Sequence, residues 1–203
     1  MKIICIARNY NDHINELSNE MPSHLLFFLK PDTSLLLNNK PFFFPTFSKK
    51  IDHEVEILVK IKKVGKKISK RFAHKYYDKI SLGIDFTARD LQSNLKSLGY
   101  PWEKSKAFDN SAVVGKWISK EKIRDINDIN FSLLKNGNIV QKESTINMIW
   151  KIDEIISEIS NYITLKIGDI IFTGSPAGVS SIKIDDFLEG YIEDKLIFAF
   201  RIK

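Results

Sequence analysis

The 203-residue chain contains one cysteine, Cys5, so it cannot form an intrachain disulfide. It has no apolar run approaching the roughly 18 residues that a membrane span requires. The opening MKIICIARNY has only five apolar residues between Lys2 and Arg8, too few for a secretory core. We therefore expect a cytoplasmic protein with no membrane partner, in which Cys5 is a small buried hydrophobe.

The sequence also lacks internal repeats, low-complexity blocks and any linker that would divide it. Hydrophobic residues make up 43% of the chain and charged residues 28%, which is typical of folded globular proteins. A chain of this length can bury roughly 70% of the surface that it exposes when unfolded. These features predict a single domain over residues 1–203.

The charge pattern does not favour nucleic-acid binding, although the net charge is +6 and the pI is about 9.2. The densest basic run, residues 60–71, holds seven Lys or Arg in twelve positions but no aromatic side chain on which a base could stack. Its pattern predicts a solvent-facing hairpin turning at Val64 and Gly65. We expect no nucleic-acid partner, and a basic binding module stays as the non-enzymatic alternative.

Short strands dominate the predicted elements, and no βαβ repeat is present, which favours an α+β fold. Asn136-Gly137 suits a type I′ turn within the hairpin 131–142. Thr87 with Asp90 can form a capping box for the helix that Gly99 ends. Further strands are expected at 2–7, 24–31, 51–61, 81–86, 169–173 and after residue 190, and helices at 11–19, 72–80, 87–98 and 146–163.

Glu54 and Glu56 lie two residues apart in the predicted strand 51–61, so both carboxylates leave the same side of it. Three interpretations are open: a solvated polar face, a general acid–base pair, or a divalent-cation site. Asp85, between a predicted strand and a helix, offers a third carboxylate. Three oxygen donors without a nearby cysteine suit Mg²⁺ or Mn²⁺ and not zinc. His53 points to the opposite face and is excluded as a ligand.

His13 and Glu16 are three residues apart on a predicted helix and therefore share a face. The carboxylate can orient the imidazole and equip it to take a proton from water, or both residues can be ordinary surface groups. Arg89 suits a substrate carboxylate, and Gln92 lies on the same helix face. Lys106 could neutralise a developing oxyanion. The loop TGSPAGV, residues 173–179, lacks the lysine and the spacing of a Walker loop.

Read together, these segments resemble the fumarylacetoacetate hydrolase family, in its short single-domain branch related to acylpyruvases. The resemblance covers residues 1 to about 180. Ser175 stands where the family usually has threonine, and the tail after Val179 is compressed and lacks the usual glycine-rich ending. The matching segments, in the family's order, are ARNYNDHINEL, FLKP, HEVEI, GIDFTARDLQ, GYPWEKSKAFD, NG followed by Q, and GDIIFTGSPAGV.

The resemblance implies mixed β-sheets rolled into a barrel-like core with flanking helices, and a homodimer. It implies one Mg²⁺ or Mn²⁺ per chain, held by Glu54, Glu56 and Asp85, and water activation by His13 and Glu16 on a mobile N-terminal helix. The residues that it places against the reacting substrate are Arg8, Arg89, Gln92, Lys106, Thr173, Gly174 and Ser175.

The expected reaction is hydrolysis of a C–C bond in an acylpyruvate-type β-diketo acid, a small-molecule substrate. His13 would activate the attacking water, and the metal would stabilise the pyruvate enolate that leaves. The same site could instead isomerise an enol of the 2-hydroxyhepta-2,4-diene-1,7-dioate or oxaloacetate type, or release CO₂ from oxaloacetate. The preference for hydrolysis depends on the His13–Glu16 pair.

Overall fold

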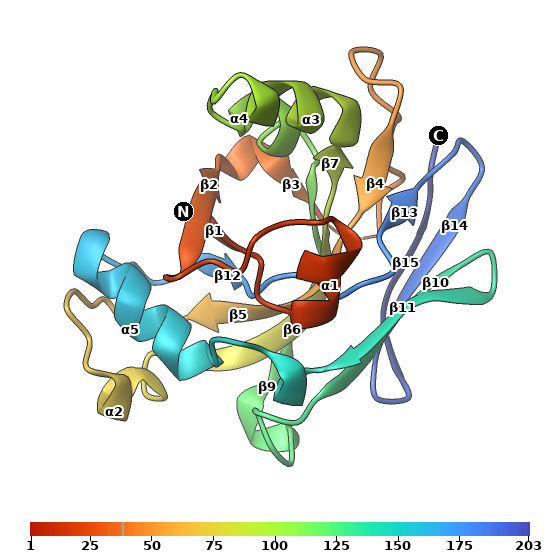
Figure 1. Ribbon diagram of the computed structural model, residues 1–203. Coiled ribbons are helices and arrows are strands. Elements are labelled where there is room, and N and C mark those ends of the chain that lie inside the picture. The colour runs from red at the N-terminus through yellow and green to blue at the C-terminus, as the bar shows by residue number, and fades with distance from the viewer. Residues whose placement is uncertain (38) are drawn as a thin grey trace.

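The computed structural model describes residues 1–37 and 39–203, and in this part of the chain strands form curved, mixed sheets with helices along their margins (Figure 1). The largest sheet has the strand order β2-β1-β12-β5-β6-β8-β3, with β9 paired to β6. Its strands are β1 (Ile3–Ala7), β2 (Leu26–Lys30), β3 (Leu35–Leu36), β5 (Val55–Ile61), β6 (Tyr77–Asp85), β8 (Ala112–Val114), β9 (Ile118–Ser119) and β12 (Ile170–Phe172).

Two smaller antiparallel sheets complete the barrel-like body. One has the order β11-β10-β14-β15 and the other the order β13-β4-β7. Their strands are β10 (Asn130–Lys135), β11 (Asn138–Ser144), β14 (Phe187–Ile192), β15 (Lys195–Arg201), β4 (Ile51–His53), β7 (Thr87–Ala88) and β13 (Ser180–Ser181). The tail after Val179 therefore keeps three strands despite its compressed sequence.

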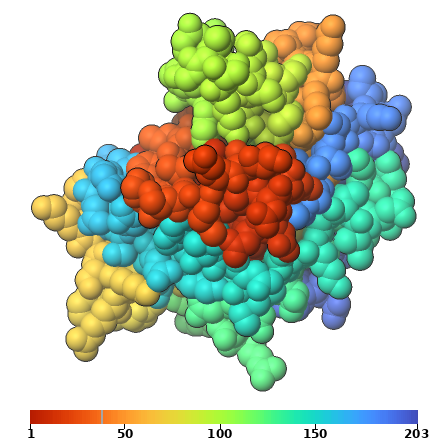
Figure 2. All heavy atoms as spheres, viewed as in Figure 1, coloured from red at the N-terminus to blue at the C-terminus, as the bar shows by residue number. Residues whose placement is uncertain are grey.

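The helices are short and lie outside the sheets. Figure 1 shows α3 and α4 at one end of the body and α5 beside α2 at its flank, and Figure 2 shows the N-terminal segment at the surface between α3 and the C-terminal strands. None of the described helices is long and apolar enough to cross a membrane. They are α1 (Asn11–Glu16), α2 (Lys70–Ala73), α3 (Arg89–Ser97), α4 (Glu103–Lys106), α5 (Ile152–Tyr162) and the 3-10 turns Asp32–Ser34, Lys120–Lys122 and Thr145–Asn147.

The core lies between the central strands and the four-stranded sheet β11-β10-β14-β15. Ile57 of β5, Leu82 of β6 and Phe198 of β15 are almost completely buried. Gly190 of β14 leaves room for the close approach of the Phe198 ring and of Leu82, which a larger side chain would obstruct. The layers therefore pack through alternating large and small residues, and this rigid body positions the strand ends described below.

Several local predictions are confirmed. Asn136 and Gly137 have φ values of 54° and 80°, as a type I′ turn requires, and they join β10 to β11. Gly99 follows α3 with a φ of 67°. Cys5 is buried in β1, which raises the pKa of its thiol well above the usual value. The predicted apolar face of α5 is buried through Ile152, Ile155, Ile156 and Ile159.

The predicted hairpin at residues 60–71 is wrong, because β5 ends at Ile61 and no partner strand follows it within the run. Instead, Gly65 exchanges backbone hydrogen bonds of 3.0 and 2.8 Å with Leu165, beyond α5. The helix predicted near 72–80 is confirmed only at its first two residues, which end α2, because Tyr77–Asp85 forms β6 between β5 and β8. Here long-range strand pairing overrides local helix propensity.

Three predicted boundaries also change. The strand expected at 51–61 is divided at Glu54 into β4 and β5, which belong to different sheets. The helix expected at 146–163 begins at Ile152. Thr87 does not cap α3, because it lies in β7 and its hydroxyl bonds elsewhere.

Candidate active site

Three buried carboxylates meet where strands from two sheets end. Glu54 lies between β4 and β5, Glu56 is in β5 and Asp85 ends β6. The antiparallel register of β5 and β6 brings these positions together, and the Asp85 amide donates to the Glu54 carbonyl at 2.8 Å. One oxygen from each carboxylate lies within 4.8 Å of the others. The same-face prediction for the two glutamates is thereby fulfilled, and the solvated-face interpretation is wrong because all three residues are buried.

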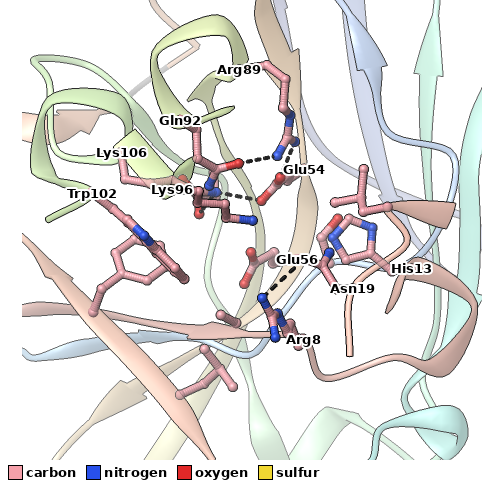
Figure 3. A pocket seen from close by; sticks show the side chains of 16 residues that line it. Arg8, His13, Asn19, Glu54, Glu56, Arg89, Gln92, Lys96, Trp102 and Lys106 are labelled. Carbon is pink, nitrogen blue, oxygen red and sulfur yellow. Dashed lines mark hydrogen bonds and ion pairs between the residues drawn. The ribbon is translucent and has the colours of Figure 1, made fainter. Parts of the chain in front are cut away.

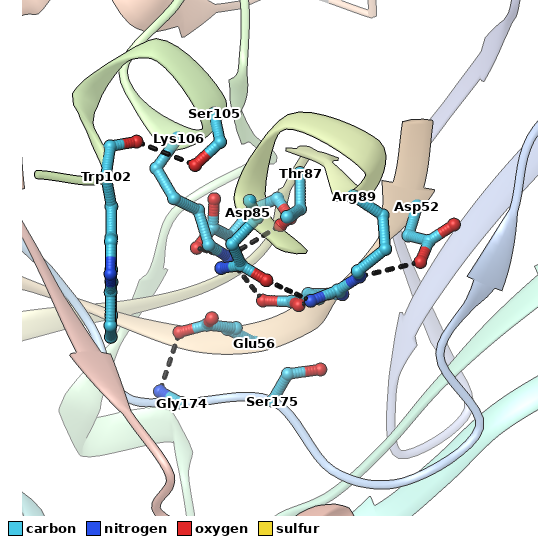
Figure 4. Close-up of polar contacts among 12 residues, drawn as sticks. Asp52, Glu56, Asp85, Thr87, Arg89, Trp102, Ser105, Lys106, Gly174 and Ser175 are labelled. Carbon is cyan, nitrogen blue, oxygen red and sulfur yellow. Dashed lines mark hydrogen bonds and ion pairs between the residues drawn. The ribbon is translucent and has the colours of Figure 1, made fainter. Parts of the chain in front are cut away.

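Cations compensate two of these carboxylates directly (Figure 4). Lys106 Nζ lies 2.6 Å from Glu54 Oε2 and 2.8 Å from Asp85 Oδ2, and Arg89 binds the other oxygen of Glu54. Burial opposes ionisation of Glu54, but Lys106 and Arg89 outweigh it and hold the pKa of this carboxyl well below its usual value. Lys30 Nζ lies 2.6 Å from Asp85 Oδ1.

Within residues 1–37 and 39–203, Glu56 has no such cation, and its Oε2 accepts only the amide N–H of Gly174, at 2.6 Å. Burial, together with the charges of Asp85 and Glu54, raises its pKa well above the usual value. The negative charge of the cluster is therefore incompletely compensated. A divalent cation among three carboxylates would correct this, and the hard oxygen donors fit Mg²⁺ or Mn²⁺.

His13 projects from α1 toward the same pocket (Figure 3). Its Nδ1 lies 3.3 Å from Glu16 Oε2, so a hydrogen bond from Nδ1 leaves Nε2 as the proton acceptor. Burial lowers the pKa of the imidazole, although Glu54 and Glu16 favour its charged form. Glu16 Oε1 also accepts from the amide of Gly178 at 3.0 Å. His13 is thus set up as a neutral base.

All three nitrogens of Arg89 donate to protein groups. Its Nε donates to Asp52 Oδ2 at 2.8 Å, and its two terminal nitrogens donate to Glu54 and to Gln92 Oε1, the latter at 2.6 Å. These acidic neighbours outweigh burial and raise the guanidinium pKa. Arg89 and Gln92 do line the pocket, but here Arg89 positions a carboxylate of the cluster.

The ammonium group of Lys106 also donates its hydrogen bonds within the protein. Besides Glu54 and Asp85, its ammonium donates to Thr87 Oγ1 at 2.6 Å, which accounts for all three N–H groups. Binding an oxyanion, as the sequence predicted, would require one of these bonds to be given up.

The loop after β12 contacts the site beside Glu56. Some of its side chains line the pocket and others face the sheet. Thr173 Oγ1 donates to the Ile57 carbonyl at 2.8 Å, so this side chain faces the sheet and does not line the pocket. Gly174 holds Glu56 through its amide, as described above. Ser175 lines the pocket, and its hydroxyl accepts from Gln141 Nε2 at 3.0 Å.

Sequence reasoning missed three residues that support the site. Lys30 is buried and also binds the Ser111 carbonyl and hydroxyl at 3.0 and 2.9 Å. Gln141 accepts from the Val55 amide at 3.0 Å and donates to the 173–179 loop. Asp52 anchors Arg89. Lys30 lies in FLKP and Gln141 follows the NG turn, so both were within quoted segments, but their roles depend on long-range contacts.

His53 lies outside the carboxylate cluster, as strand alternation predicted. It is buried away from the cluster, with Nδ1 2.9 Å from Gln141 Oε1 and Nε2 2.8 Å from Ser180 Oγ. Burial lowers its pKa.

The pocket above the carboxylates encloses about 40 Å³. Figure 3 shows His13 and Arg8 on one side and residues of α3 and α4 on the other. Its remaining wall is formed by Ile6, Ala7, Leu17, Asn19, Phe28, Lys96 and Trp102. Of the predicted site residues, all but Glu16, Thr173 and Gly174 line this pocket. Glu16 and Gly174 bind His13 and Glu56 of its lining, and Thr173 bonds to the sheet instead.

Comparison with known proteins agrees with this geometry. Residues 2–197 match the family model described as fumarylacetoacetate (FAA) hydrolase C-terminal. A mitochondrial oxaloacetate tautomerase of Mus musculus is 38% identical over 201 residues, which cover 99% of this chain and 91% of that protein. A mitochondrial oxaloacetate decarboxylase of Dictyostelium discoideum is 40% identical over 183 residues, covering 90% of this chain and 84% of the other.

Among solved structures, fumarylpyruvate hydrolase from Pseudomonas aeruginosa, in complex with Mn²⁺ and pyruvate, superposes with a TM-score of 0.94 at 28% identity. The match covers 100% of this chain and 89% of that one. The likeness therefore extends over the whole fold and includes the segments that carry the carboxylates, His13 and Lys106. The chain belongs to the fumarylacetoacetate hydrolase family.

Proposed function

We propose that this chain is a metal-dependent enzyme of 2-oxo acids that interconverts their enol and keto forms, with oxaloacetate as the test substrate. The observation that supports this most is the convergence of three buried carboxylates and the neutral imidazole of His13 on one pocket. The carboxylates suit a cation, and the imidazole suits a proton. Tautomerisation needs both and needs no other reactant.

Glu54, Glu56 and Asp85 would hold the cation, which supplies positive charge for the carboxylate and the 2-oxo oxygen of such an acid. His13 Nε2 takes a proton from C3 of the keto acid, and the C–H electron pair becomes the C2–C3 double bond. The same proton then returns to the oxygen on C2. Glu16 keeps the ring in the required tautomer. The reverse sequence gives the keto form, so the reaction consumes no water.

The size of the pocket supports a small substrate. About 40 Å³ holds only a few water molecules. A four-carbon acid therefore fits with less displacement of the surrounding side chains than a long acylpyruvate does. The relatives from Mus musculus and Dictyostelium discoideum, which are named for oxaloacetate chemistry, support the same substrate type.

The test follows the ultraviolet absorbance of enol-oxaloacetate as it converts to the keto form. We expect the Mn²⁺- or Mg²⁺-loaded chain to accelerate this decay and His13→Gln to lose most of the acceleration while Mn²⁺ still binds. A matched control is His74→Gln, at an exposed histidine after α2. Decay at the uncatalysed rate with metal-loaded protein contradicts the proposal.

Hydrolysis of acylpyruvates is the second candidate, favoured by the His13–Glu16 pair and by the likeness to a fumarylpyruvate hydrolase. His13 would then take a proton from water, and the hydroxide would attack the carbonyl remote from the carboxylate. Incubation with acetylpyruvate separates the two functions, since hydrolysis releases pyruvate and acetate. Release of CO₂ from oxaloacetate would identify decarboxylation instead.

The homodimer, the cytoplasmic location and the choice between Mg²⁺ and Mn²⁺ stay as predictions. The relatives support a small-molecule keto acid as the partner. The manganese in the Pseudomonas aeruginosa structure supports a divalent cation, and metal-binding measurements distinguish Mg²⁺ from Mn²⁺.

A further inference from the structure

Four cations surround the pocket, and they differ in how their charge is compensated. Arg89 and Lys106 form ion pairs with the carboxylates described above. Arg8 and Lys96 also line the pocket. Across residues 1–37 and 39–203, no ion pair joins either of these two to a carboxylate. Two uncompensated positive charges at a small pocket indicate an anion that is brought by the ligand.

Arg8 is held in place by its backbone. It follows β1 with a φ of 59°, a left-handed conformation that costs free energy for a residue with a side chain. Asn9 fixes this turn, since its side-chain amide donates to the carbonyls of Trp150 and Thr173 at 3.0 and 2.7 Å and accepts from the Trp150 amide at 2.7 Å. The strain is thus maintained by buried bonds at a pocket wall.

The guanidinium of Arg8 is only partly satisfied. It donates to the Glu20 carbonyl and to Asn19 Oδ1, both at 3.1 Å, and both are uncharged oxygens. Because a guanidinium carries five N–H donors, donors are left over for a charged group in the pocket. These two contacts also fix the side chain without neutralising it.

Lys96 reaches the pocket from the opposite wall, on α3 (Figure 3). Its ammonium lies 5.4 Å from the centre of the Trp102 ring, and no hydrogen bond to it occurs within the described part of the chain. Partial burial lowers its pKa, the positive charges of Arg8 and Arg89 lower it further, and Glu54 opposes them. Arg8 and Lys96 therefore repel each other across space that an anion would fill.

We propose that Arg8 and Lys96 form a subsite for a second carboxylate of the substrate, at the end remote from the metal. This inference rests on the proposed function, in which the 2-oxo acid end of the substrate faces Glu54, Glu56 and Asp85. An anion between Arg8 and Lys96 removes their repulsion and takes up their free donors. Trp102 and Phe28, which also line the pocket, shield that contact from water.

The subsite defines a substrate class. It favours short 2-oxodicarboxylic acids over acylpyruvates that end in a methyl group, although both present the same 2-oxo acid end to the metal. The acylpyruvase-like substrate that the sequence predicted lacks the group that Arg8 and Lys96 would bind. In such a substrate the two half-buried cations would face an apolar end that accepts none of their hydrogen bonds, which is unfavourable.

The test uses two stable ligands that differ only at the remote end. N-oxalylglycine ends in a carboxylate, and N-ethyloxamate has a methyl group in its place. Their dissociation constants are measured by isothermal titration calorimetry on the Mn²⁺-loaded chain. Since a hydrogen bond to a charged group contributes at least about a tenfold factor, two of them predict a preference of about 100-fold for N-oxalylglycine.

Lys96→Met and Arg8→Met should each reduce this preference about tenfold and leave the affinity for N-ethyloxamate and for Mn²⁺ unchanged. Lys96→Met is the cleaner variant, because Arg8 also contacts Asn19 and Glu20. Lys104→Met is the matched control, since Lys104 is exposed on α4 and does not line the pocket. It should keep the full preference.

Equal affinity of the wild-type chain for the two ligands overturns the subsite, as does an undiminished preference in Lys96→Met and Arg8→Met. A loss of affinity for both ligands alike also contradicts it, because that marks a general disturbance of the pocket. Preference for N-oxalylglycine without any tautomerisation activity contradicts the proposed reaction and supports the subsite. Tautomerisation of oxaloacetate without a preference for N-oxalylglycine supports the proposed reaction and contradicts the subsite.

Discussion

At the scale of single residues, the site is governed by how buried charges are compensated. Glu54 and Asp85 each have cations on both carboxylate oxygens, whereas Glu56 has one amide and no cation from the described part of the chain. Glu56 is therefore the carboxylate with most to gain from a metal ion and the one that costs most to keep charged without it. A substitution of Glu56 should therefore weaken metal binding without lowering the stability of the fold.

Glu56→Gln should lower Mn²⁺ affinity by at least about 100-fold, since removing even a supporting group of a metal site costs 10–100-fold. It removes a buried charge but keeps the volume, so the melting temperature of the metal-free protein should not fall. Calorimetric titration with Mn²⁺ checks the affinity, and thermal melting of the metal-free protein checks the stability. A variant that binds Mn²⁺ like the wild type would contradict the assignment of Glu56 as a ligand.

His13 gives a pH prediction. The neutral imidazole is the active base, and burial lowers its pKa below the usual value of about 6.5. Activity should therefore persist below that pH and be lost as pH falls through the lowered pKa of His13. The pH profile of kcat/KM for tautomerisation shows this as an acid limb.

Glu16→Gln serves as the companion variant. Glu16 favours the charged imidazole, so its neutralisation should move the acid limb to still lower pH. An acid limb above 6.5 in the wild type, or a shift to higher pH in Glu16→Gln, would show that another group is being titrated.

Much of the residue-level site could be predicted from sequence, because alternation on a strand and spacing on a helix are local properties. The pairing of Glu54 with Glu56 and of His13 with Glu16 follows from such spacing. Lys30 could not be predicted in this way. Its partner Asp85 is 55 positions away, and only the three-dimensional fold brings a buried lysine to that carboxylate.

At the scale of elements, the predictions were correct where backbone geometry is decided locally and wrong where a distant partner decides it. Asn136-Gly137 favours a type I′ turn without help from distant residues. In contrast, Tyr77–Asp85 is a strand because β5 and β8 flank it. The division of residues 51–61 at Glu54 likewise depends on β7 and β13, which pair with β4 alone.

The loop after β12 offers a test at this scale. Gly174 has a φ of 100°, and an added Cβ would lie 2.6 Å from the Asn9 Cβ. Gly174→Ala should therefore cost roughly 1–2 kcal/mol for its backbone and a further 1–3 kcal/mol for the clash. Gly99→Ala is the control, since its φ is 67° but no atom lies within 4 Å, so only the first cost applies. Urea unfolding measures the loss of unfolding free energy in each of the two variants.

If both variants lost the same stability, the contact with Asn9 would have no part in holding the loop. We also expect Gly174→Ala, and not Gly99→Ala, to weaken Mn²⁺ binding, because the Gly174 amide holds Glu56.

At the scale of the whole molecule, the α+β class and the barrel-like arrangement agree with the sequence prediction, and the family match spans nearly the full chain. The site combines residues that are far apart in the sequence, from Ile6 to Ser175. Such a site can exist only in the folded protein. Metal binding should therefore stabilise the fold by mass action.

With free Mn²⁺ about 100-fold above its dissociation constant, the unfolding free energy should rise by about 2.7 kcal/mol. For a chain of this size, each kcal/mol corresponds to about 2–4 °C, so the melting temperature should increase by about 5–10 °C. Differential scanning calorimetry with and without Mn²⁺ tests this. The Glu56→Gln variant should show little increase at the same Mn²⁺ concentration.

The break at Glu54 has a consequence for how an occupied site would be detected. β4 belongs to the three-stranded sheet and β5 to the eight-stranded sheet, so Glu54 lies at the seam where one sheet passes into the other. A ligand that holds Glu54 against Glu56 and Asp85 also restrains that seam. Amide hydrogen exchange beside β4 should therefore slow when the site fills, for example at the Ile182 amide, which follows β13 and bonds to the Ile51 carbonyl at 2.9 Å.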